Sequence, residues 1–360
     1  MISKIKALLK SKGNDANPQL HPSRKPSSFK EVTTYPIIDR PDNAHAIHLD
    51  MIIALLPLIA WSVYLYGPRP IIITLISAIM TLGLDIAVRS ALKKEMSFDI
   101  SPLITGLITA ACLPPSSPLW LPVFTSVIAA FIRNISFGRQ RSIFNPSAFA
   151  LLISFISFPK IMTAVPAPNQ LLDPFSFSVS GYKAVGTDAL NVVLKGYLPE
   201  NSLWELLLGL RGGMIGEMSA LLLIGGAIYL CIRRIYKPLL PITYILSVAG
   251  ISYFFPTLAA ASDTLALKGS LYNILGMNTM LCAVYMASDT VSTPRSPIGT
   301  VIAGIVGGAV TVSVRYHFSI EISALCGIIV INLLSLFLDR FLKRSPFGGW
   351  ITPDAEGINN

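Results

Sequence analysis

Charged residues are scarce in this chain of 360 residues. Only 13% of the residues are Asp, Glu, Lys or Arg, and 52% are hydrophobic, whereas about a quarter of a soluble domain is charged. The composition therefore argues against a soluble protein. The apolar residues fall into separate blocks of roughly 15–22 residues, close to the roughly 20 that a helix needs to cross a bilayer core. We predict an all-α polytopic membrane protein, embedded in the lipid bilayer.

The motifs of soluble catalysis are also missing. No GxGxxG, Walker, HExxH or GxSxG element is present, so no nucleotide-binding or hydrolytic module is indicated and no catalytic residue is predicted. The four cysteines, Cys112, Cys231, Cys282 and Cys326, form no CxxC pair. We expect them to pack as small apolar residues, with a membrane-embedded iron–sulfur ligand as the alternative. The chemistry must therefore come from a cofactor or an ion.

Ten apolar segments are expected, at roughly 51–66, 69–88, 101–115, 118–132, 144–158, 214–232, 238–255, 271–287, 297–313 and 320–339. The net charge of +9 does not indicate a nucleic-acid partner, because the basic residues gather at the ends of these segments. An amino terminus in the cytoplasm places most basic clusters on the cytoplasmic side. Of the 28 lysines and arginines, seven fall on the other side: Arg69, Lys160, Lys183, Lys195, Arg211, Lys268 and Arg315. This bias predicts ten crossings with both termini cytoplasmic.

Ten crossings in two sets of five make the second half run inverted relative to the first. The third segment of each half ends in a proline-rich break, at 113–118 and at 288–297, which is typical of an inverted repeat whose broken helices meet at a central site. Two unrelated proline-capped helix ends are the alternative. The predicted parts are a basic cytoplasmic segment (1–50), a five-helix half (51–158), an extracytoplasmic loop (159–213), a second five-helix half (214–340) and a cytoplasmic tail (341–360).

Three polar residues stand out against these apolar segments. Asn145 lies in the stretch Phe144-Asn145-Pro146-Ser147, Glu217 follows a glycine pair and enters an apolar helix, and Asp289 follows a helix end. Each also has a structural explanation, as a helix cap, a close helix crossing or a turn. An acid within an apolar segment is usually functional or paired. Asp85 and Arg89 are expected to form a local i,i+4 pair, and His45 and His48 to lie at the membrane interface.

Five stretches in order resemble the RnfD/NqrB family, whose members are the RnfD component of the Rnf complex and the NqrB component of the sodium-translocating NADH:quinone reductase. The resemblance runs from about Asp50 to Lys343. The stretches are LDMIIALLPLIAWSVYLYG (49–67), LITGLITAACLPP (103–115), FGRQRSIFNPSAFALLISFISFP (137–159), GGMIGEMSALLLIGGAIYLCIRR (212–234) and MASDTVSTP (286–294). The resemblance implies an enzyme subunit that is inactive alone and works within a translocase-type oxidoreductase complex of the cell membrane.

The same resemblance implies cofactors and partners. Members carry FMN joined by a phosphoester to a threonine of the outer loop, attached by a flavin transferase, and a second, non-covalent flavin, riboflavin or FMN. By position Thr187 would be the acceptor, while Asn145, Glu217 and Asp289 would shape the flavin or ion path. Before Thr187 the chain reads Gly181-Tyr182-Lys183-Ala184-Val185-Gly186, so only the acceptor of the transferase signature is kept. An ordinary loop threonine is therefore the equal alternative.

We expect a Rnf-type membrane subunit that passes electrons through flavin, within a ferredoxin:NAD+ oxidoreductase complex, and helps to move Na+ or H+. Two alternatives stay open. An inverted repeat with broken helices also suits a transporter or channel for a small solute, which needs no flavin. The altered acceptor sequence also suits a flavin-poor scaffold in a related electron-export system.

Overall fold

Helices make up the regular structure of the described residues, which are 44–91, 93, 99–135, 143–177, 192–195, 197, 202–235, 237–256, 263–287, 289 and 292–342 of the computed structural model. A first group is α2 (Ala44–Tyr66), α3 (Arg69–Ala91), α4 (Ser101–Ala111), α5 (Trp120–Ile135) and α6 (Pro146–Ser157). Two short helices follow, α7 (Pro159–Met162) and α9 (Leu203–Leu208). A second group is α10 (Ala220–Ile232), α11 (Leu239–Phe254), α12 (Asp263–Leu275), α13 (Thr279–Leu281), the π-helix η1 (Cys282–Met286), α14 (Pro297–His317) and α15 (Ile320–Phe341).

Length and apolar composition explain why several of these helices suit a bilayer. Within the described residues, four are long and apolar enough to cross a membrane: Ala46–Tyr66, Arg69–Ala91, Pro297–His317 and Ile320–Phe341. Five shorter apolar helices lie in other predicted apolar segments. They are α4, α5, α6, α10 and α11. The prediction of an all-helical polytopic membrane protein is thus confirmed for the part of the chain that is described.

Polar caps and prolines set where several helices begin. Ser296 Oγ accepts a hydrogen bond from the N–H of Gly299 at 3.0 Å, and Pro297 follows as the first residue of α14. Ser219 Oγ accepts one from Leu222 N–H at 3.3 Å and starts α10. A capping side chain satisfies an N–H that the helix leaves unpaired, and proline is favoured in the first turn.

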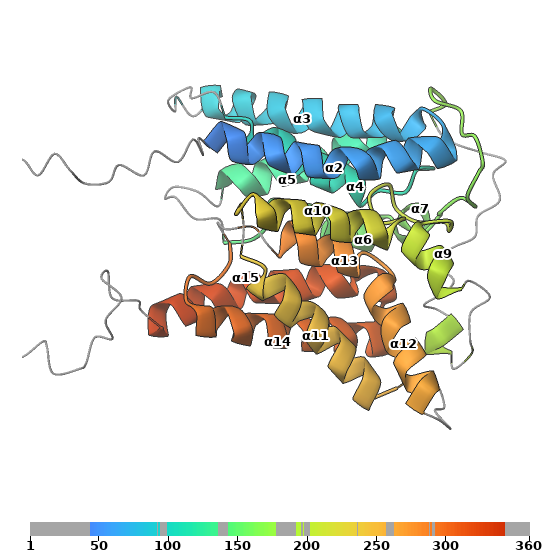
Figure 1. Cartoon of the computed structure of the whole chain (residues 1–360). Coiled ribbons are helices and arrows are strands. Elements are labelled where there is room, and N and C mark those ends of the chain that lie inside the picture. The colour runs from blue at the N-terminus through green and yellow to red at the C-terminus, as the bar shows by residue number, and fades with distance from the viewer. Residues whose placement is uncertain are drawn as a thin grey trace, which may run out of the picture. The chain divides into compact units, whose positions relative to one another are not determined.

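The two helix groups each pack internally and meet along a central seam. In the first group α3 packs on α4 and α5, and in the second α14 packs on α11 and α15. Across the seam α10 lies against α2 and α15 lies against α6, while α13 and η1 pack against α10 within the second group (Figure 1). The buried hydrophobic core runs through both groups. The seam therefore brings residues from the two halves of the chain together.

Glycines let α14 approach its neighbours closely. A Cβ added at Gly308 would lie 2.6 Å from the Cβ of Ser247 on α11, and one at Gly307 would overlap Ile331 on α15. Small residues at such contacts allow helix backbones to pack tightly within a membrane. α14 is thus held between α11 and α15, and so supports the face of α15 that looks onto the seam.

Several predicted boundaries differ from the structure. α2 begins at Ala44, before the predicted start at residue 51, and α10 begins at Ala220, so the predicted helix start at 214 is wrong. The segment expected at 271–287 is a broken helix, in which α12 ends at Leu275 and α13 starts at Thr279. The break contains Met277 (φ 35°) and Asn278 (φ 55°). Left-handed backbone at non-glycine residues ends a helix, and hydropathy does not register it.

Candidate functional site

Two interrupted helices meet at the centre of the seam. α4 ends at Ala111 and passes into the irregular stretch around Cys112, Leu113 and Pro114, while α13 and η1 begin after the break that follows α12. The irregular segment before α10 pairs with the end of α4, because Gly216 N–H donates to Ala111 O at 2.7 Å and Ile215 N–H donates to Leu113 O at 3.0 Å. These hydrogen bonds satisfy backbone groups that the bilayer could not.

Gly216 is where the two interrupted helices come closest to that segment. A Cβ at this position would lie 2.6 Å from the Cβ of Ala111 and 3.1 Å from Cδ1 of Leu281. The first distance is shorter than real Cβ contacts allow. Glycine is therefore required here by close approach, and the residues that follow Ala111 and Leu281 are the two cysteines Cys112 and Cys282.

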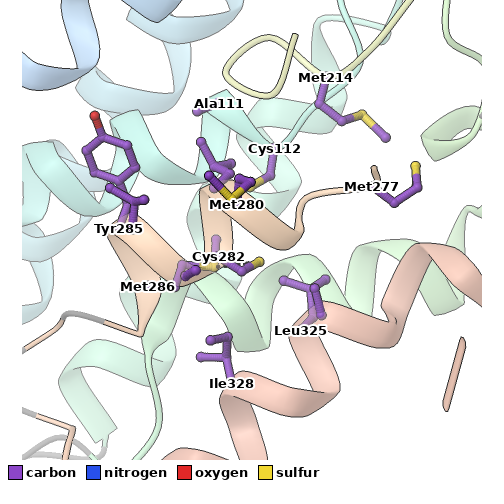
Figure 2. Packing of buried hydrophobic residues seen from close by; sticks show 14 of the residues in the cluster. Ala111, Cys112, Met214, Met277, Met280, Cys282, Tyr285, Met286, Leu325 and Ile328 are labelled. Atoms are coloured by element: carbon purple, nitrogen blue, oxygen red, sulfur yellow. Dashed lines mark hydrogen bonds between the residues drawn. The ribbon is translucent and has the colours of Figure 1, made fainter. Parts of the chain in front are cut away.

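Sulfur atoms and apolar groups fill this centre. Figure 2 shows Cys112, Met280, Cys282 and Met286 gathered beside Leu325 and Ile328 of α15. Cys282 Sγ and Met286 Sδ are 3.7 Å apart, and both cysteines are free and fully buried. Among the described residues no group of three or more His, Cys, Asp or Glu is placed to hold a metal ion. We call this apolar cluster the central constriction.

Polar groups lie at one end of the central constriction, here called the Glu217 end. Glu217 is 4% exposed and lies in the turn before α10, not inside a helix as predicted. Its Oε1 accepts a hydrogen bond from Arg211 Nη2 at 3.1 Å, and the same nitrogen donates to Leu275 O at 2.9 Å. Glu217 also lies within electrostatic range of Cys112 and Cys282. The hydrogen bond from Arg211 agrees with the expectation that this acid is paired or functional.

A second buried arginine lies at the Glu217 end. Arg315, at the end of α14, is 2% exposed and within electrostatic range of Glu217. It donates to the carbonyl oxygen of Asn273 at 2.7 Å, to Thr279 Oγ1 at 2.8 Å and to Ser323 Oγ at 3.2 Å. Arg315 thus bridges the break between α12 and α13. Two guanidinium groups, one buried and one largely enclosed, therefore lie near one buried carboxylate at this end.

The opposite end of the central constriction, where η1 ends, is here called the Asp289 end. It contains the other two candidate residues that the structure describes, Asn145 and Asp289. Asn145 caps α6, since its Oδ1 accepts from the N–H groups of Ser147 (3.0 Å) and Ala148 (3.2 Å), and its Nδ2 donates to Met286 O at 3.3 Å. Asp289 accepts a hydrogen bond from Ser292 Oγ at 3.2 Å. Asn145 and Asp289 are therefore close together through η1, and Glu217 is at the opposite end. The amide of Asn145 is fully engaged in these contacts.

An ion network joins α3, α4 and α5. The predicted i,i+4 pair is present, with Arg89 Nε 2.7 Å from Asp85 Oδ2. The sequence did not indicate that Arg133 also approaches Asp85 (3.5 Å) and Asp99 (3.3 Å), or that Arg89 contacts Asp99 at 3.2 Å. Burial by itself would raise the pKa of Asp99, but the Ser101 N–H, Arg133 and Arg89 outweigh it and hold that pKa below its usual value.

Arg69 is a residue whose role sequence reasoning missed. It is fully buried at the start of α3. Its guanidinium donates to the carbonyl oxygens of Pro115 (3.1 Å) and Ser117 (2.8 Å) in the break after α4, and to those of Asp173 (2.7 Å) and Ser176 (3.0 Å). Arg69 thus ties the segment after α7 to the proline-rich break. The only sequence feature that could have indicated this role is a long, charged side chain at the start of an apolar helix.

Thr187 lies outside the described residues, as do 178–186 and 188–191. The chain on either side of them is anchored. Leu119 N–H donates to Phe177 O at 3.3 Å, next to the break after α4, and Val193 is fully buried in the core. The predicted flavin segment therefore follows directly on residues that contact Arg69 and the break after α4.

Comparison with known proteins covers almost the whole chain. Residues 31–348 match the model of the NQR2, RnfD, RnfE family. The D subunit of the Na+-translocating ferredoxin:NAD+ oxidoreductase complex of Acetobacterium woodii is 28% identical over 321 residues, which is 88% of this chain and 95% of the relative. The D subunit of the proton-translocating complex of Clostridium ljungdahlii is 24% identical over 329 residues (88% and 96%). The D subunit of the ion-translocating oxidoreductase complex of Stutzerimonas stutzeri is 27% identical over 330 residues (84% and 91%).

Proposed function

We propose, from the premise that the chain belongs to the NQR2, RnfD, RnfE family, that it is a membrane subunit of an ion-translocating, flavin-dependent electron-transport complex. Two relatives matched over nearly their full length are named as subunits of a Na+-translocating and of a proton-translocating ferredoxin:NAD+ oxidoreductase complex. The structural observation that carries the proposal is the meeting of two interrupted helices at the central constriction. The subunit acts together with other subunits of the complex and is inactive alone.

The fold supports ten crossings of the cell membrane with both termini in the cytoplasm. The first helix group contains an interrupted element, α4 with the break after Ala111, and the second contains the broken α12, α13 and η1. An interrupted element in each group supports the inverted repeat of five and five. On this topology the Asp289 end faces the cytoplasm. The Glu217 end and residues 159–213 then lie toward the extracytoplasmic side.

For the cofactor, we propose FMN attached to Thr187 by a flavin transferase, with a second, non-covalent flavin. A bound flavin would supply one- and two-electron transfer. The contribution of the described residues is positioning, because Arg69 and the Leu119 to Phe177 hydrogen bond fix the segment that leads to Thr187. The amide of Asn145 binds the last residue of η1, Met286. We therefore assign Asn145 a structural role, which is to hold the end of η1 in place.

The central constriction gives the subunit a barrier to ions. Cys112, Met280, Cys282 and Met286 are buried, apolar or weakly polar side chains, and a hydrated ion is excluded from such a site. Polar and charged groups lie at both ends. An ion can therefore pass only when the interrupted helices move apart, and we propose that electron transfer drives that movement.

The test is the intact complex purified from its native cells. We expect a flavin-bearing peptide that contains Thr187, heavier by one FMN, and loss of that mass in Thr187→Ala. Thr163→Ala, a change at a threonine in the described part of the same connection, is the control and keeps the mass. A complex without any flavin opposes the proposal, and solute uptake by the isolated chain in liposomes without an electron donor favours the transporter alternative. An active complex with an unmodified Thr187 peptide favours the scaffold alternative.

A further inference from the structure

The side chain of Asn332 is a buried polar group that the electron-transfer role leaves unexplained. Asn332 lies within α15, is fully buried, and neither its Oδ1 nor its Nδ2 has a hydrogen-bond partner. Nearly all buried polar groups in proteins are paired, because an unpaired one loses its hydration without compensation. In contrast, every polar atom of the Asn145 amide is used. The free amide of Asn332 therefore points to a ligand.

The position of Asn332 along α15 places it at the Asp289 end. Ile328, four residues earlier, packs at the central constriction beside Met286 (Figure 2). Ser335, three residues later, donates from its Oγ to Ser292 O at 2.9 Å. Residues three and four apart share one face of a helix. Asn332 therefore lies on the face of α15 between the end of η1 and Ser292, whose own hydroxyl donates to Asp289.

The charges around the two ends differ in sign. The Glu217 end holds the buried Arg315 and the largely enclosed Arg211 near one buried carboxylate, Glu217. Near the Asp289 end, Arg133 lies within electrostatic range of three carboxylates, those of Asp85, Asp99 and Asp289, and of one further cation, Arg89, so carboxylates outnumber arginines there. Asn278, at the Glu217 end, is another buried and unpaired amide, but the neighbouring arginines repel cations there. A cation is therefore better accommodated at Asn332.

We propose that the carboxamide oxygen of Asn332 is one of several oxygen ligands of a partly dehydrated alkali-metal cation, which enters from the Asp289 end and binds on that side of the central constriction. Hard cations take oxygen ligands, and a neutral amide oxygen holds such an ion weakly enough to release it. An amide does not titrate in the physiological range, so this position selects a metal cation over a proton. The inference rests on the proposed ion translocation and names its cation class.

The experiment compares variants of the complete complex in proteoliposomes, with uptake of radioactive sodium and the Na+ dependence of electron transfer as readouts. Asn332→Leu removes the oxygen and keeps the branched shape of the side chain. We expect it to raise the half-saturating Na+ concentration about 10- to 100-fold without lowering the thermal midpoint, because no hydrogen bond is lost. Asn332→Asp keeps an oxygen and adds a charge, and should lower the half-saturating concentration. Asn145→Leu is the matched change at a paired amide and should lower the thermal midpoint.

The outcomes separate this inference from the proposed function. Wild-type Na+ dependence in both Asn332 variants overturns the cation site while electron transport stands. If Asn332→Leu fails to assemble, unchanged Na+ dependence in Asn332→Asp overturns it equally. A wild-type complex that moves protons and ignores Na+ also overturns it. A wild-type complex with neither flavin nor electron-driven ion uptake overturns the proposed function itself.

Discussion

Replacing Arg69 by methionine should destabilise the protein more than any single surface change. The substitution keeps the long apolar stem but removes every guanidinium donor. The carbonyl oxygens of Pro115 and Ser117, and those of Asp173 and Ser176, then lose their partner. A buried carbonyl left unpaired costs about 1–3 kcal/mol. Pro115 and Ser117 are themselves buried, so these two alone predict a loss of about 2–6 kcal/mol.

The assay is the thermal midpoint of the purified protein or complex in detergent, followed by tryptophan fluorescence. At about 2–4 °C per kcal/mol for a large domain, Arg69→Met should lower the midpoint by roughly 10 °C. Arg69→Lys keeps the charge but not the forked set of donors, so its thermal midpoint should lie between those of the wild type and Arg69→Met. Arg340→Met, at an exposed arginine near the end of α15, is the control and should leave the midpoint within about 1 °C. A midpoint for Arg69→Met equal to that of the control would refute the reasoning.

Two further predictions concern the central constriction and the ion network. Gly216→Ala places a Cβ 2.6 Å from the Ala111 Cβ and should lower the free energy of unfolding by about 1–3 kcal/mol through overpacking. The control is Gly225→Ala, whose added Cβ meets no neighbouring atom within 4 Å, and which should be neutral or stabilising. Equal thermal midpoints for the two variants would contradict the close approach at Gly216. The pKa of Asp99 is held below its usual value, so its ionised form contributes stability above about pH 4, and this contribution is lost as the pH falls through the folded-state pKa. Asp99→Asn should therefore be less stable than the wild type at neutral pH, and the difference in thermal midpoint should shrink on acidification below about pH 4; a constant difference would contradict the assignment.

The apolar segments and their helical state could be predicted from hydropathy, because a run of apolar residues of membrane length has few alternatives. The interruption between α12 and α13 could not. It depends on left-handed backbone at Met277 and Asn278, and neither residue lowers the hydropathy of a window enough to reveal it. The same limit applies at residues 214–219, where an apolar and glycine-rich stretch pairs with the end of α4 instead of forming a helix turn.

The candidate residues were found by their contrast with apolar surroundings, and their partners were not. Glu217 was conspicuous as a single acid in an apolar stretch. Its partner Arg211 lies only six residues earlier in the sequence. The contact between Arg315 and Asn273 joins residues 42 positions apart, which no local pattern reports. Asn332 was passed over because an asparagine in an apolar helix is unremarkable until its hydrogen bonds are counted.

The buried arginines change the meaning of the charges assigned to the extracytoplasmic side. Arg69 and Arg315 are buried and Arg211 is largely enclosed, with backbone carbonyls and a carboxylate as partners, so little of these charges is presented to lipid headgroups or solvent. The remaining basic residues proposed for that side are all lysines: Lys160, Lys183, Lys195 and Lys268. On the proposed topology, each of the three arginines must cross the membrane as a cation during insertion, before its partners are in place, because guanidinium does not deprotonate. On that topology, packing of the two interrupted helices and enclosure of these charges depend on each other, because the carbonyl groups that bind the arginines lie at the breaks.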